Sequence, residues 1–138
     1  MVTTTLVEVS ESVRRAGKEL LKTIDELGID CQGLFWKAFS ENDWRFFIVS
    51  QRVATEGIRS YLLDLHRAVD SLSEQDRQVI LSYGTVPVHP GELVVRELIG
   101  RYGNVVEDRM VRRIVLSPEE AYIFRLNVDK KFPLHPLT

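Results

Sequence analysis

Two apolar segments separated by a short polar segment form the most prominent pattern in the chain, between residues 34 and 53. The segments LFWKAF and WRFFIVSQRV hold four of the six Phe and both Trp, and the residues between them are SEND. Apolar runs on either side of turn-forming residues are typical of a β-hairpin. Strands that are apolar on consecutive residues are usually covered on both faces or lie centrally in a sheet. The pattern therefore predicts a hairpin at the centre of the fold.

Apolar positions with helical spacing predict three helices around this hairpin. Spacings of three and four residues recur from Ser10 to Leu27 and again from Thr55 to Leu72, which is the period of an amphipathic helix. Gly28 provides the left-handed stop for the first helix. A third helix is expected to begin in the segment HPGE and to end near Arg101, because proline at a first helical position loses no needed hydrogen bond.

Three further segments have the composition of strands. Val79–Tyr83 and Thr85–Val88 are apolar and largely β-branched, and we expect them to form one strand that bends at Gly84. Met110–Leu116 and Glu120–Leu126 are expected to form a second hairpin. The predicted order is thus α-β-β-α-β-α-β-β, with a mainly antiparallel five-stranded sheet and helices packed on it. This is an α+β fold.

Length and composition fit one domain, which we assign to residues 1–126, followed by an extended, proline-containing tail at residues 127–138. The chain has 138 residues, of which 44% are hydrophobic and 28% charged, and its net charge is -2. This balance gives no general attraction to nucleic acid or acidic membranes. The lone Cys31 excludes an internal disulfide and fits a reducing compartment. No signal peptide or membrane-spanning run is recognisable, so the predicted location is the cytoplasm.

Three segments resemble a family of uncharacterised small bacterial α+β proteins. They are the helix ending in LGID with the aromatic strand and the turn into WRFFIVS, the passage VPVHPGELVVREL, and the final strand EEAYIFRL. The resemblance extends over most of residues 15–126, and SPEE stands where the family has a longer polar loop. It implies an α+β fold and a bacterial origin. It implies no activity.

No spacing of residues predicts a catalytic, cofactor or metal site. Cys31 has no partner at a metal-ligand spacing, and P-loop and nucleophile-elbow motifs are absent from the sequence. His66 precedes Asp70 by one helical turn, and His89 lies where a strand meets a helix. A small hydrolase-like enzyme with His66 or His89 in a cleft is therefore one alternative. A surface histidine and a helix cap are the commoner roles of such residues.

A nucleic-acid-associated accessory protein is another alternative. Residues 101–131 contain seven basic and five acidic side chains. The predicted second hairpin would present Arg112, Arg113 and Arg125 to a nucleic acid. The excess of two positive charges is small for such an interface.

A non-enzymatic, self-associating interaction module is the function that we expect. If the first two helices cover the same face of the sheet, apolar residues of the first hairpin remain on the other face. Prolines in the tail reduce the entropy lost when an extended peptide docks. Its partner is expected to be itself or another protein. The residues of this predicted interaction surface are Phe46, Phe47, Ile48, Val49, Phe132 and Leu134.

Overall fold

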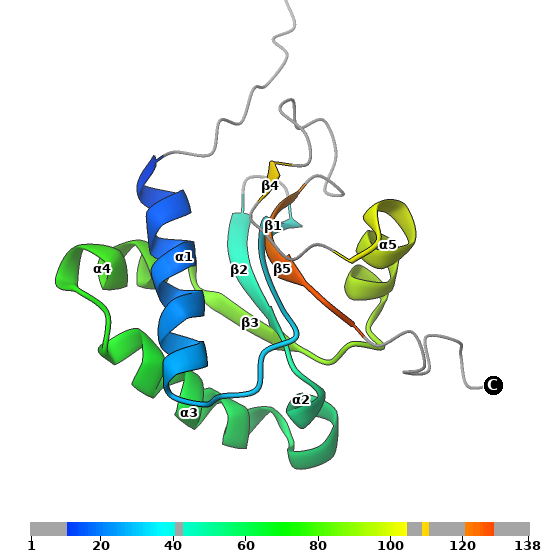
Figure 1. Ribbon diagram of the computed structural model, residues 1–138, viewed down its shortest axis with the longest axis horizontal. Helices are drawn as coiled ribbons and strands as arrows, with labels where there is room; N and C mark the ends of the chain where they lie inside the picture. The colour runs from blue at the N-terminus through cyan, green and yellow to red at the C-terminus, as the bar shows by residue number, and fades with distance from the viewer. Residues whose placement is uncertain (1–10, 41–42, 105–108, 111–120, 129–138) are drawn as a thin grey trace, which may run out of the picture.

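A mixed sheet with helices on both faces forms the described part of the chain (Figure 1). The computed structural model describes residues 11–40, 43–104, 109–110 and 121–128. The helices are α1 (Glu11–Glu26), α2 (Gln51–Glu56), α3 (Ile58–Asp70), α4 (Glu74–Tyr83) and α5 (Leu93–Tyr102). The strands are β1 (Gly33–Ser40), β2 (Asp43–Val49), β3 (Thr85–Val88), β4 (Arg109–Met110) and β5 (Ala121–Leu126). No helix among the described residues is long and apolar enough to cross a membrane.

The predicted first hairpin is confirmed, and its first strand lies in the middle of the sheet. The strand order is β3-β2-β1-β5-β4. β1 pairs antiparallel with β2, with Leu34 opposite Ile48 and Trp36 opposite Phe46. On its other side β1 pairs antiparallel with β5, while β3 runs parallel to β2. Because β1 and β2 both lie inside the sheet, their consecutive apolar residues face protein on both sides.

The two faces of the sheet carry separate cores. Figure 1 shows α1, α3 and α4 on one side of the sheet and α5 on the other. The first core contains, among others, Leu20, Leu34, Trp36, Phe46, Ile48, Tyr61, Leu65, Ile80 and Phe124. The second contains Phe35, Phe47, Val49, Val88, Val95, Leu98, Ala121, Ile123, Leu126 and Val128. Residues of β1 and β2 alternate between the two cores, as the pleat requires. In β5 an irregularity in the pairing with β1 places Phe124 and Leu126 in different cores.

The predicted strand at Val79–Tyr83 is wrong, because these residues form the last half of α4. The Ser73 hydroxyl accepts a hydrogen bond from the Asp76 backbone N–H and caps the helix, which satisfies one of the free amides of its first turn. Gly84 ends it with φ +88°. A short apolar run fits either a helix or a strand, and the cap decides the outcome here. Only Thr85–Val88 is a strand.

The second predicted helix, Thr55–Leu72, is divided into α2 and α3. Gly57 separates them with φ +92°, a conformation that suits glycine and breaks helical hydrogen bonding. The cap of α2 is Ser50, whose side chain accepts from the Arg52 backbone N–H. Thr55, where the predicted helix begins, instead lies inside α2.

The α+β class is confirmed, whereas the predicted order of elements is not. Two extra helices stand between the first hairpin and β3, and the parallel pairing of β2 with β3 makes the sheet mixed. β4 has only two residues, so four strands form the body of the sheet. Most of the predicted strand Met110–Leu116 lies outside the described residues, as does the start of its partner at Glu120.

Candidate functional site

The hairpin residues of the predicted interaction surface are buried inside the chain. Phe46, Ile48 and Val49 are 0% exposed and Phe47 is 5% exposed. The expectation that one face of the hairpin stays uncovered is therefore corrected: α5 covers it. The other two residues of that surface, 132 and 134, lie outside the described part of the chain.

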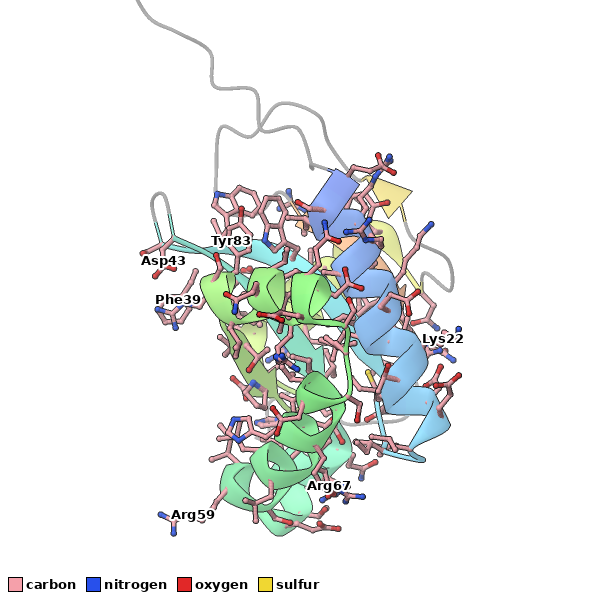
Figure 2. All side chains as sticks on the ribbon, turned by 90° about the vertical axis from the view of Figure 1, so that its left-hand side faces the viewer. Lys22, Phe39, Asp43, Arg59, Arg67 and Tyr83 are labelled. Atoms are coloured by element: carbon pink, nitrogen blue, oxygen red, sulfur yellow. The ribbon has the colours of Figure 1, made fainter. Side chains whose placement is uncertain are left out.

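An exposed aromatic side chain lies instead at the turn end of the hairpin. Phe39, at the end of β1, is 54% exposed. The Arg45 guanidinium carbon lies 4.1 Å from the centroid of its ring. Asp43 holds Arg45 in place by accepting hydrogen bonds from Nε at 3.2 Å and Nη2 at 2.9 Å. Figure 2 shows Phe39 and Asp43 projecting away from the helices. We call these three residues the Phe39 cluster.

A shallow surface depression, with no enclosed space large enough for a water molecule, lies between β1 and α5; we call it the hollow. It is lined by Lys37, Val94, Glu97, Leu98 and Arg101. Two of these residues are buried, since Lys37 is only 6% exposed and Leu98 only 2% exposed. The α5 wall of the hollow combines apolar and charged side chains.

The hollow and the Phe39 cluster occupy the same face of the sheet. Lys37 is two residues before Phe39 on β1, so their side chains point to the same side. Lys37 is also directly opposite Arg45 of the cluster. At the N-terminal end of α5, beside Val94, Leu93 is 65% exposed. The sheet face that carries the second core thus has exposed apolar side chains at its edge, namely Phe39 and Leu93.

A second group of polar residues lies at the opposite end of β2. The Ser50 hydroxyl donates to the Asp30 carboxylate at 2.6 Å and accepts from the Arg52 N–H at 3.1 Å. The Tyr61 hydroxyl donates to the Asp30 carbonyl oxygen at 2.7 Å, and burial raises the pKa of Tyr61 above its ordinary value. The two bonds to Asp30 join the segment before β1 to the elements that follow β2, and the bond between Ser50 and Arg52 caps α2. The bonds to Asp30 thus hold this end of the sheet to the segment that precedes β1.

The hydrolase hypothesis requires His66 or His89 in a cleft, and His89 takes part in the hydrogen bonds of its own turn. His89 Nδ1 accepts from the Gly91 N–H at 3.1 Å, and the His89 backbone N–H donates to Glu92 Oε2 at 3.1 Å. These bonds shape the turn that leads into α5. His66 is exposed on α3, and neither histidine lines the hollow. The hollow is therefore not the cleft that the hydrolase alternative requires.

Arg125, one of three predicted nucleic-acid contacts, forms hydrogen bonds with residues of the same chain. Its guanidinium donates to both carboxylate oxygens of Asp25, at 3.0 and 2.7 Å, and to the Cys31 carbonyl oxygen at 3.3 Å. The hydrogen bond with Asp25 raises the pKa of Arg125. Arg112 and Arg113 lie outside the described residues, so their part of that hypothesis stays a prediction.

Comparisons of the chain with models of protein families, with curated proteins and with solved structures found no match. The resemblance to a bacterial family therefore stays a prediction. Within the described residues, no three His, Cys, Asp or Glu side chains gather in a way that could hold a metal ion.

Sequence reasoning missed the Phe39 cluster and the hollow. The predicted turn SEND includes Asp43, whereas in the structure β2 begins at Asp43, so that Asp43 and Arg45 share a face of the strand. Which of the strand's faces they share with Phe39 depends on the strand pairing. That pairing has an irregularity between Ala38 and Ser40, which the alternation of residue types does not reveal.

Proposed function

We propose that the protein is a non-enzymatic interaction module that associates with a second copy of itself through the face formed by the Phe39 cluster and the hollow. The supporting observation is an exposed phenylalanine held beneath an arginine that is itself fixed by a carboxylate. Interface centres are enriched in aromatic and arginine side chains. The lone Cys31 fits a reducing compartment such as the cytoplasm.

Pre-organisation of the cluster favours binding. Ordering a flexible side chain at an interface costs roughly 0.5–1.5 kcal/mol. Arg45 already holds one geometry through its two bonds to Asp43, and Phe39 has few rotatable bonds. Most of the ordering cost is therefore already incurred in the free protein. Burial of the half-exposed ring of Phe39 on binding then adds favourable free energy.

The residues around the hollow add further contacts for a partner surface. Val94 offers apolar contact, while Glu97 and Arg101 offer one charge of each sign. A surface with both signs beside an apolar centre suits contact with another copy of the same surface, since the acid of one copy can lie near the base of the other.

Sedimentation velocity of the full chain over a range of micromolar concentrations tests the proposal. We expect a monomer–dimer equilibrium that Phe39→Ser weakens at least tenfold, because removal of an anchoring aromatic costs roughly 2 kcal/mol or more. Leu81→Ser is the matched control. Leu81 is 60% exposed but belongs to α4, on the other side of the sheet. A strict monomer, or equal weakening by both changes, would contradict the proposal.

A further inference from the structure

Helix α2 is weakly supported by packing. It has only six residues, and none of its side chains is fully buried. Helices this short are unstable in water unless tertiary contacts hold them. Val53 contributes a partial contact with the first core, and Gly57 follows the helix at φ +92°. The segment thus has a natural hinge and little apolar contact to keep it folded.

One side chain, Arg52, supplies most of the polar contact between α2 and α3. Its Nη1 lies 2.8 Å from Asp64 Oδ2, and its Nη2 lies 3.4 Å from Ser60 Oγ. Its guanidinium carbon lies 5.1 Å from the centroid of the Tyr61 ring. Within α2 it also donates to Glu56 at 3.0 Å. Charge-assisted hydrogen bonds are stronger than neutral ones, so this residue dominates the closure of α2 onto α3.

α2 lies where the two parallel strands of the sheet end. The Ser50 N–H donates to the Val88 carbonyl oxygen at 2.9 Å, so the ends of β2 and β3 are neighbours. From there the chain passes to opposite faces: α2, α3 and α4 follow β2 on one side, and α5 follows β3 on the other (Figure 1). In sheets with parallel strands, such points of divergence are open to ligands.

We infer that α2 is a latch that opens and closes over this end of the sheet while the sheet and α3 stay folded, with Arg52 as the side chain that closes it. Opening breaks the bonds of Arg52 to α3 and uncovers the Tyr61 ring and the Ser50 hydroxyl. The inference is independent of the proposed interaction face, because the latch lies at the C-terminal end of β2 and the Phe39 cluster at its N-terminal end.

Hydrogen exchange of the full chain, followed by mass spectrometry, tests the latch. In the wild type, amides of α2 should exchange faster than those in the middle of α3, since local opening requires less free energy than global unfolding. Arg52→Ala should accelerate exchange in α2 by about tenfold, with β1 and α3 unchanged. Asp64→Asn removes the charged partner from the α3 side and should have the same local effect.

Arg67→Ala is the matched control. Arg67 also binds Asp64, with Nη1 3.1 Å from Oδ1, but both residues belong to α3, so its loss should leave α2 exchange unchanged. The latch is refuted if wild-type α2 is protected as well as the centre of α3. It is also refuted if Arg52→Ala accelerates exchange in α2, α3 and β1 to the same extent, which would show a general loss of stability.

Discussion

Gly17 of α1 lies directly against the ring of Phe124 of β5. A Cβ atom on Gly17 would be 2.6 Å from Phe124 Cε1 and nearer still to the ring tip, and the ring is only 2% exposed. Close approach of helix and sheet at this point thus requires a residue without a side chain. The contact joins the first described helix to the last described strand.

Gly17→Ala should destabilise the protein in spite of the better helix propensity of alanine. Overpacking of a buried site costs about 1–3 kcal/mol, whereas alanine gains at most about 1 kcal/mol over glycine in a helix. Urea unfolding followed by circular dichroism measures the balance. Gly100→Ala is the control, because a Cβ there meets no atom within 4 Å. It should stabilise the chain slightly, and a stable Gly17→Ala variant would disprove the close approach.

Arg125→Lys should remove most of the stabilisation that the ion pair between Arg125 of β5 and Asp25 of α1 provides. The Arg125 guanidinium meets Asp25 with two parallel hydrogen bonds, a geometry that a lysine ammonium cannot reproduce. The Asp25 side chain is 48% exposed, so solvent screening limits the expected loss to about 1 kcal/mol. A double-mutant cycle with Asp25→Asn in urea unfolding isolates the pair. Full stability in the lysine variant would show that charge alone matters.

The carboxyl group of Asp64 should contribute to the acid dependence of stability. Its hydrogen bond with Arg52 holds the pKa of Asp64 below its usual value. The group ionises near pH 3.9 in an unfolded chain, so its contribution is complete above about pH 4. It is lost as the pH falls through the lower pKa of the folded state. Asp64→Asn should therefore flatten the fall in unfolding free energy between about pH 5 and pH 2.

Asp70→Asn serves as the control for that measurement. Asp70 is exposed on the same helix, and its side chain makes no ion pair within the described residues. Its substitution should leave the acid limb of the stability curve as in the wild type. If both variants change that limb equally, the pair between Arg52 and Asp64 is not the cause.

The sequence predicted the centre of the fold better than its periphery. The first hairpin follows from local composition, because long apolar runs on both sides of the turn-forming segment SEND are typical of two paired strands. The segment Val79–Leu81 has only three apolar residues, which match a strand and a helix equally well. The cap at Ser73 and Asp76 was present in the sequence and favours the helix.

The interaction face could not be derived from periodicity, because it depends on where α5 lies. Connections from β2 and β3 leave the sheet on opposite sides, so Phe47 and Val49 become core residues, and Phe39 is the exposed aromatic residue of the described hairpin. No local pattern specifies which side a connection takes. The contact of Arg45 with Phe39 further depends on the strand register, which is a property of two strands together.

Trp36→Phe should be much less destabilising than a typical change of a buried aromatic. Trp36 stacks on Trp44, with ring centroids 4.4 Å apart, and meets Tyr83 edge-on at 5.5 Å. Its Nε1–H is buried and has no hydrogen-bond acceptor within the described residues. A buried donor without a partner costs about 1–3 kcal/mol, and phenylalanine keeps an aromatic ring while removing that donor. The free energy lost with the smaller stacking area should nearly equal the free energy gained by removing the buried N–H that has no acceptor.

Urea unfolding of Trp36→Phe and Trp36→Ala separates the two contributions. The alanine variant should lose about 3–5 kcal/mol, as buried aromatic truncations do, while the phenylalanine variant should stay within about 1 kcal/mol of the wild type. Trp44→Phe is a useful comparison, because Trp44 is only partly buried and its indole can reach water. A Trp36→Phe variant as unstable as Trp36→Ala would mean that the indole N–H has a partner that stabilises the fold.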